Sequence, residues 1–375
     1  MSEVHSDKFA GGEVQTMTSL ARVVSLLAAA LLATATASYS QAPSKYPVTE
    51  GDYVAHGFKF TSAEQLPELR LHYATLGKLA RDAQGHPTNA VLILHGTGGS
   101  GQQFLSPQFA EELFSPGQLL DINRYFIILP DGIGHGKSSR PSDGMHAHFP
   151  AYDYDDMVAA QHLLVAEGLG VQHLRLIMGT SMGCMHSFVW GETYPDFMDA
   201  LMPLACLPVQ IAGRNRLWRK MLMDAIRDDP AWKGGEYTEE PMDGLRTAED
   251  LLVIAGGAPL VMQKTLPTRD AADHYAERRS VGLDANDLLY QVNASRNYDP
   301  SPQLEKITAP MMWINSADDF INPPELGIAE KESKRLKNGT FVLLPISELT
   351  HGHSTHTWAV AWRSYLSELL DKTAH

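Results

Sequence analysis

The sequence predicts an α/β fold in which a mostly parallel central sheet carries a helical insertion. Short apolar runs bounded by turn residues recur along the chain, and the stretches between them are long enough for helices. Such runs are typical of parallel strands, because helices bury both faces of a parallel sheet. The strand signal disappears between Leu207 and Thr308. We therefore expect a core formed by residues 45–207 and 308–375, and a helical lid formed by residues 208–307.

Each predicted element corresponds to a particular run. The candidate parallel strands are Ala90–Leu94, Tyr125–Leu129, Leu174–Met178, Ala200–Ala205, Met311–Ile314 and Phe341–Leu344. Ahead of them, Tyr53–Phe60 and Leu69–Thr75 alternate more clearly between apolar and polar residues, which favours an antiparallel edge. The predicted lid helices are Leu217–Arg227, Thr247–Ile254 and Asp270–Arg278.

Composition excludes several classes of protein. With 44% hydrophobic and 20% charged residues, the 375-residue chain has an ordinary globular make-up. The formal charge is -14 and basic residues form no run, so nucleic acid is not an expected partner. Two cysteines are too few for a disulfide scaffold or a four-cysteine zinc site.

The N-terminal region resembles a secretory signal. The apolar run Val23–Ala37 follows Arg22, is short for a membrane-spanning helix, and ends in small residues that suit signal peptidase. The acidic residues within 1–16 make a poor signal start, which favours Met17 as the initiator. We expect residues 1–37 to be a cleaved signal peptide and the mature protein to be periplasmic or secreted, without stable membrane insertion. The alternative is an uncleaved anchor helix.

The motif Gly-Thr-Ser-Met-Gly at 179–183 is the strongest chemical signal. It lies between an apolar run and a segment that can be helical, which is the context of a nucleophile elbow. There the serine hydroxyl, here that of Ser181, is exposed at the end of a strand. A plain glycine-rich turn is the alternative interpretation.

A serine nucleophile needs a histidine base and an acid, in the chain order serine, acid, histidine. Asp318 and Asp319 both follow the predicted strand Met311–Ile314, and we favour Asp319 because Ile321 and Pro323 follow it at the usual spacing. We favour His353 as the base, over His351 and His356, because a Gly-His pair can close the loop over the nucleophile.

Two backbone N–H groups are predicted to form the oxyanion hole. Met182 follows the serine at the start of a helix, and Thr97 lies in the glycine-rich loop His95–Gly99. That loop lacks the sequence of a phosphate-binding motif. The spacing of His351, His353 and His356 also occurs in metallo-hydrolases, but the third histidine lacks a preceding aspartate, so we expect no metal.

Several longer stretches resemble the homoserine O-acetyltransferase family of the α/β-hydrolase superfamily. They include NAVLILHGTGG, DGIGHGKSS and MGTSMGCMHSFVWGETYP, with DDPAWKGGEY, PMDGL and LDANDLLYQ in the lid, and the resemblance runs from about Leu71 to Trp362. It implies an α/β-hydrolase fold, a triad of Ser181, Asp319 and His353, and acetyl-CoA as acyl donor. The chain has Cys184 where the family has a second glycine. It has Met223 where the family's lid helix usually carries an arginine, in the region that receives the homoserine carboxylate.

The predicted compartment favours water as the acyl acceptor, because an exported enzyme would not meet acetyl-CoA. We therefore expect a serine hydrolase that cleaves an ester, or an amide, of a small acyl substrate through acyl-Ser181, without a cofactor. The alternatives are an O-acyltransferase of the homoserine O-acetyltransferase type and a lid-bearing binding protein without activity. The sequence leaves a homodimer open.

The two cysteines follow neighbouring predicted strands. Cys184 starts the helix after the elbow and Cys206 ends the next apolar run, so both should lie near one edge of the sheet. Two buried free thiols are the default expectation, and a disulfide between them is the alternative.

Overall fold

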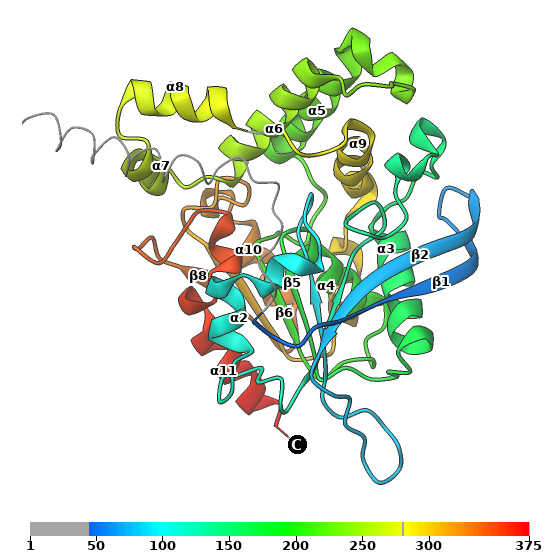
Figure 1. Cartoon of the computed structure of the whole chain (residues 1–375). Helices are drawn as coiled ribbons and strands as arrows, with labels where there is room; N and C mark the ends of the chain where they lie inside the picture. Colours follow the sequence, from blue (N-terminus) through cyan, green and yellow to red (C-terminus); the bar gives the residue numbers. More distant parts are fainter. Residues whose placement is uncertain (1–44, 280, 375) are drawn as a thin grey trace, which may run out of the picture. The chain divides into compact units, whose positions relative to one another are not determined.

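An eight-stranded sheet runs through the part of the chain that the computed structural model describes, residues 45–279 and 281–374 (Figure 1). The predicted signal peptide, residues 1–37, lies outside these residues. The strand order is β1-β2-β4-β3-β5-β6-β7-β8. The strands are β1 Thr49–Lys59, β2 Gln65–Leu76, β3 Ala90–Leu94, β4 Phe126–Pro130, β5 Leu176–Thr180, β6 Leu201–Leu204, β7 Met311–Ser316 and β8 Gly339–Leu344.

The parallel part of the sheet brings the ends of distant segments together. Strands β1 and β2 pair antiparallel at one edge, β2 continues antiparallel onto β4, and every later pairing is parallel. In register, Leu94 of β3 pairs with Gly179 of β5, and Thr180 of β5 pairs with Leu204 of β6. The loops that follow these strands therefore meet at the same edge of the sheet, which is where ligands bind in open α/β sheets.

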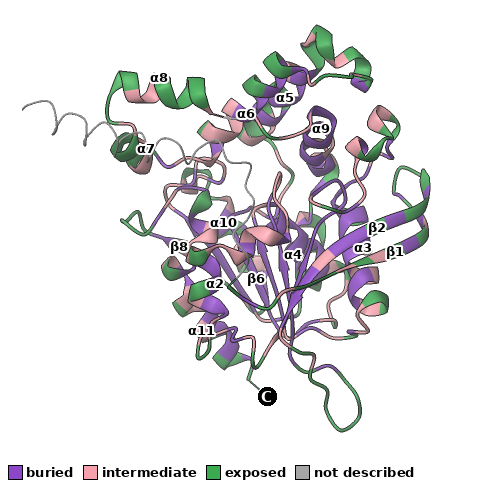
Figure 2. Cartoon of the chain, viewed as in Figure 1, coloured by how far each residue is buried: buried purple, intermediate pink, exposed green. Residues whose placement is uncertain are grey.

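Helices bury both faces of the sheet (Figure 2). Successive residues of β3 alternate between two apolar clusters, with Leu92 and Leu94 in one and Val91 and Ile93 in the other. This two-sided burial explains why the strands are continuous apolar runs in the sequence. The core helices are α2 Pro107–Leu113, α3 Tyr154–Leu163, α4 Met182–Thr193, α10 Ile328–Glu332 and α11 Arg363–Lys372.

The predicted strands overlap the observed ones but differ at their ends. Strand β5 starts at Leu176 rather than Leu174, because Leu174 makes only an isolated bridge to Met198. It also runs two residues beyond the predicted end, because Gly179 and Thr180 still pair with the neighbouring strands. The serine of the elbow therefore follows the last paired residue of β5 directly.

Helices occupy the chain between β6 and β7. They are α5 Gly213–Asp228, α6 Met242–Gly256, α7 Pro259–Thr265, α8 Arg269–Arg278 and α9 Ala285–Asn293. The three helices predicted from the sequence fall within α5, α6 and α8, whereas α7 and α9 had no predicted counterpart. Apolar residues of α5, α6 and α9, among them Leu222, Leu245 and Leu288, form a third cluster. Among the described residues, no helix has the length and apolar character needed to cross a membrane.

Candidate active site

Ser181 lies in a sharp turn between β5 and α4. Its backbone has φ 54° and ψ -107°, a strained conformation for a residue with a side chain. The flanking glycines permit the turn, because a Cβ on Gly179 would lie 1.9 Å from the Gly183 carbonyl oxygen, and a Cβ on Gly183 would lie 2.1 Å from that of Leu94. The Ser181 amide donates to the carbonyl oxygen of Leu204, which anchors the turn to β6. This is the geometry of a nucleophile elbow.

Ser181, His353 and Asp319 form a hydrogen-bonded relay. The Nε2 atom of His353 lies 2.8 Å from Ser181 Oγ, and its Nδ1 atom lies 2.9 Å from Asp319 Oδ2. The three residues come from the loops after β5, β7 and β8. The structure thus brings together the three residues that the sequence singled out, at distances suited to proton transfer.

The Asp319 carboxylate is held by more than its histidine. Its Oδ1 atom accepts the amides of Ile321 and Asn322, at 2.7 and 3.1 Å, and its Oδ2 atom accepts the side-chain amide of Asn322 at 3.0 Å. Burial alone would raise the pKa of Asp319, but the facing His353 and these hydrogen bonds outweigh it and hold the pKa below its usual range. The carboxylate is therefore ionised and fixed in orientation.

The neighbouring Asp318 contacts the histidine loop rather than the histidine ring. One of its oxygens accepts the hydroxyl of Ser316, and the other accepts the amide of Gly352 at 3.0 Å. Gly352 has φ 61° and precedes the relay histidine. Asp318 therefore anchors the histidine loop, whereas Asp319 faces the histidine ring itself.

The three neighbouring histidines occupy separate environments. The His351 ring stacks on Trp358, with ring centroids 3.9 Å apart, and the His356 ring meets that of His353 edge-on at 5.2 Å. Burial, reinforced by His353, lowers the pKa of His356 to about 3, so this ring is neutral at ordinary pH. Within the described residues, no group of three His, Cys, Asp or Glu side chains is placed to hold a metal ion.

The predicted oxyanion donors come from two segments that lie close to the serine. Met182 is the first residue of α4, and the first amides of a helix have no partner within it. Thr97 follows Gly96 in the loop after β3, and this loop approaches closely, because a Cβ on Gly96 would lie 3.3 Å from Ser181 Cβ. Gly183 donates to the carbonyl of His95 at 3.0 Å and ties the loop to the elbow.

The family described as alpha/beta hydrolase fold matches residues 89–358 of this sequence. The chain belongs to the α/β-hydrolase superfamily. The homoserine O-acetyltransferase of Moorella thermoacetica is 36% identical over 308 residues, which cover 70% of this chain and 80% of that protein. The resemblance predicted from the sequence is thereby confirmed.

Solved structures share the same fold at lower identity. An acetylester hydrolase from Corynebacterium glutamicum superposes with a TM-score of 0.75 at 21% identity, covering 86% of this chain and 96% of that one. A homoserine O-acetyltransferase from Bacillus anthracis superposes with a TM-score of 0.74 at 20% identity, covering 86% and 98%. The protein is thus an enzyme of the α/β-hydrolase superfamily, similar to both acetyltransferases and esterases.

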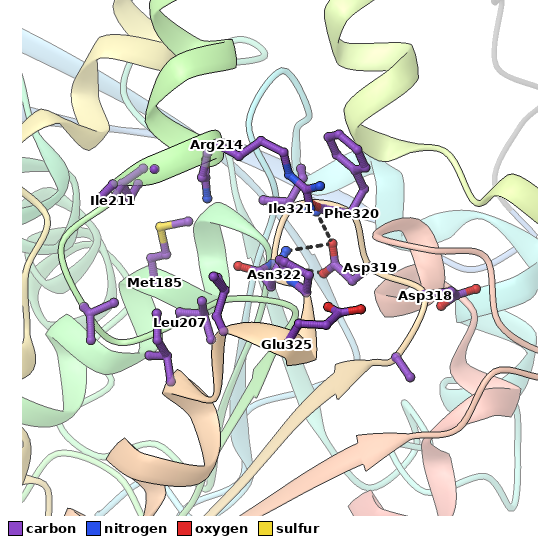
Figure 3. A pocket seen from close by; sticks show the side chains of 18 of the residues that line it. Met185, Leu207, Ile211, Arg214, Asp318, Asp319, Phe320, Ile321, Asn322 and Glu325 are labelled. Atoms are coloured by element: carbon purple, nitrogen blue, oxygen red, sulfur yellow. Dashed lines mark hydrogen bonds between the residues drawn. The ribbon is translucent and has the colours of Figure 1, made fainter.

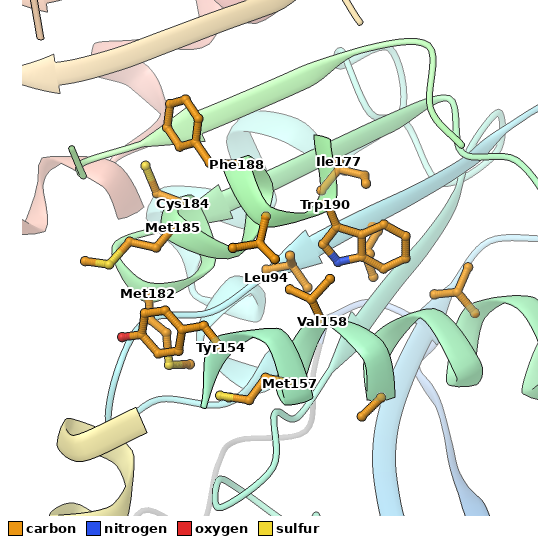
Figure 4. Packing of buried hydrophobic residues seen from close by; sticks show 14 of the residues in the cluster. Leu94, Tyr154, Met157, Val158, Ile177, Met182, Cys184, Met185, Phe188 and Trp190 are labelled. Atoms are coloured by element: carbon orange, nitrogen blue, oxygen red, sulfur yellow. The ribbon is translucent and has the colours of Figure 1, made fainter. Parts of the chain in front are cut away.

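In this α/β hydrolase, a disulfide joins Cys184 to Cys206, so the default expectation of two free thiols is wrong. Both cysteines are fully buried, and their Cα atoms lie 5.8 Å apart. Cys184 is in the first turn of α4, packed among residues such as Leu94 and Phe188 (Figure 4). The bond joins the nucleophile helix to the segment after β6, because adjacent parallel strands end side by side.

The disulfide also lies next to the acid of the relay. The carbonyl oxygen of Ala205, one residue before Cys206, accepts the side-chain amide of Asn322 at 3.0 Å. The same amide group donates to Asp319. Asn322 is not among the residues predicted from the sequence, although it lies only three positions after the acid. It connects the segment that carries Cys206 to the loop that carries the acid.

The hydrolase lid also contains a buried arginine, close in sequence to Met223. Arg219 of α5 is 3% exposed and bonds to two neutral oxygens, Asn215 Oδ1 at 2.9 Å and Ser295 Oγ at 3.3 Å. Burial lowers the pKa of this guanidinium, and Tyr154 opposes the shift. Burial raises the pKa of Tyr154, while Arg219 and the hydroxyl of Thr97 lower it. Among the described residues no carboxylate forms an ion pair with Arg219, so a buried positive charge lies near the oxyanion loop without an acidic partner.

Proposed function

We propose that this protein is a serine esterase that acts through an acyl-Ser181 intermediate. The observation that carries the proposal is the relay, in which His353 contacts both the Ser181 hydroxyl and the Asp319 carboxylate. The Asp319 carboxylate accepts a hydrogen bond from Nδ1–H of His353, which leaves Nε2 unprotonated and free to act as a base. In this proposal Ser181 is the nucleophile, His353 is the general base, and Asp319 orients the histidine.

The reaction follows from this arrangement in two halves. In the first, His353 takes the proton of Ser181 while Oγ attacks the ester carbonyl, and the amides of Thr97 and Met182 stabilise the oxyanion. The histidine then gives its proton to the leaving alcohol, and acyl-Ser181 remains. In the second half, His353 deprotonates a water that attacks the acyl-enzyme, and the free acid leaves.

Two observations support water as the acceptor. Met223, at the position where the homoserine O-acetyltransferase family usually has an arginine, is buried in the apolar cluster of the lid. The Cys184–Cys206 disulfide suits an oxidising compartment, which supports export after cleavage of residues 1–37. Sequencing the N-terminus of the protein recovered from the periplasm or medium tests export. A mature terminus after Ala37 supports it, and retention of residues 1–37 in the cytoplasm contradicts it.

The second candidate is an O-acyltransferase of the homoserine O-acetyltransferase type. The names of the curated relatives favour this reaction over hydrolysis. The structural observation that favours it is Arg219 of the lid, because a buried guanidinium without an acidic partner suits a substrate that carries a carboxylate. The acyl-enzyme half would be the same, and only the second nucleophile would differ.

One set of assays separates the candidates. A fluorophosphonate probe should label the purified protein and fail to label Ser181→Ala, and equal labelling of both contradicts the acyl-serine mechanism. Hydrolysis of esters in water, without release of CoA from acetyl-CoA, supports the esterase. Release of CoA from acetyl-CoA only when homoserine is present supports the transferase instead.

A further inference from the structure

A cavity of about 740 Å³ lies beside the relay, between the segment after β6 and the loop after β7 (Figure 3). Its walls are mainly apolar and include Met185, Leu207, Val209, Ile211, Phe320 and Ile321. The volume is in the range of cavities that hold drug-sized ligands. An acetyl group would leave most of it empty.

The cavity begins close to the nucleophile. Met185 lies one turn beyond Ser181 on α4, its amide donates to the Ser181 carbonyl oxygen at 3.1 Å, and its side chain lines the cavity. Asp319 contributes to another part of the wall. The cavity lies over the ends of β6 and β7, and β6 is the strand next to the serine's strand. Ser181 and His353 do not themselves line the cavity, so a substrate held at Ser181 would reach it past Met185 and Asp319, which do.

The charged groups on the wall have other partners or face solvent. The Arg214 guanidinium lies 3.7 Å from the centre of the Phe320 ring and donates to the Phe320 carbonyl oxygen. Asp318 and Asp319 are held by the histidine loop and the histidine ring, as described above. Glu325 is exposed. The rest of the cavity wall, which a ligand would contact, is mainly hydrocarbon.

We propose that this cavity binds an apolar arm of the substrate, so that the preferred ester carries a medium-length aliphatic chain or an aromatic ring. This inference rests on the proposed acyl-Ser181 chemistry and adds its substrate class. Each methylene that is fully buried in such a cavity raises kcat/KM by up to about fourfold. The value of kcat/KM should therefore rise with the length of the substrate chain until the chain fills the cavity.

The test uses two series of esters with the purified protein. In one series the acyl chain grows from acetyl to decanoyl on a fixed p-nitrophenol, and in the other the alcohol grows from methanol to octanol on a fixed acetyl group. A rise in kcat/KM of at least tenfold along either series supports the proposal, and the series that rises identifies which side of the ester occupies the cavity. Flat profiles in both series overturn it.

A variant that fills the cavity adds a second measurement. In Ile211→Trp, the ratio of kcat/KM between the longest and the shortest ester of the rising series should fall at least tenfold from its wild-type value. Val54→Trp, on the exposed face of β1, is the matched control and should keep the wild-type profile. An unchanged profile in Ile211→Trp contradicts the assignment. If the wild-type protein neither reacts with the fluorophosphonate probe nor hydrolyses any of the esters, the proposed function itself is refuted.

Discussion

Removing the disulfide should destabilise the enzyme by an amount that the chain length between the cysteines determines. The bond closes a loop with a sequence separation of 22 residues. The entropy lost by the unfolded chain on closing such a loop corresponds to about 3 kcal/mol. For a folded unit of this size the unfolding entropy is roughly 0.7 kcal/mol per kelvin, so Tm should fall by about 4 °C.

The measurement is calorimetry on Cys184→Ala, Cys206→Ala and the double variant. Either single substitution removes the whole cross-link, so the two single losses should be nearly equal and the double loss should not be their sum. Activity should also fall in all three, because the segment that carries Cys206 supports Asn322 and, through it, Asp319.

Two results would refute the reasoning. Additive and small losses, with Tm within about 1 °C of wild type for each single variant, would mean that no cross-link stabilises the fold. Titration of two free thiols in the denatured, unreduced protein would mean that the bond does not form. After either result, the disulfide would no longer support the proposed export of the protein.

Three further predictions concern the relay and its surroundings. Asp319→Asn should lower kcat by about 10⁴-fold in ester hydrolysis with the fold intact by circular dichroism, because the amide favours the wrong histidine tautomer; a loss below tenfold contradicts the assigned role. Gly183→Ala should destabilise the protein by about 2 kcal/mol in urea unfolding, because its Cβ would press on the carbonyl of Leu94, whereas Gly256→Ala, with open space around it, should not. Burial lowers the pKa of His186 to about 3, so the unfolded chain binds an extra proton between about pH 6.5 and pH 3, and stability should fall as pH falls through that window. His186→Asn should flatten this part of the Tm-against-pH curve, and an unchanged slope would contradict the assignment.

Much of the architecture was predictable because it depends on local patterns. Buried parallel strands need continuous apolar residues, so the runs at Ala90–Leu94 and Met311–Ile314 were recognisable. The elbow needs glycines two residues before and after the serine, because neighbouring backbone atoms leave no room for a Cβ at Gly179 or Gly183. In both cases the residues that produce the local structure lie within a few positions of one another in the sequence.

Strand and helix ends were less predictable, because pairing across the sheet decides where they fall. Strand β5 continues through two residues with little strand character, since neighbouring strands offer hydrogen bonds to them. Helices α7 and α9 had no counterpart among the predicted helices. Helix α9 is held by packing against α5 and by the Asp284 side chain, which caps its first turn.

The sequence by itself determined the fold class, the nucleophile elbow and the order of serine, acid and histidine, because these follow from residue type and short-range spacing. Tertiary structure decided which of two adjacent aspartates faces the histidine, that Cys184 and Cys206 are joined, and that Arg219 is buried without an acidic partner. Those features depend on which atoms meet when loops from different strands reach the same edge of the sheet. Contacts between residues so far apart in the chain leave no periodic pattern in the sequence.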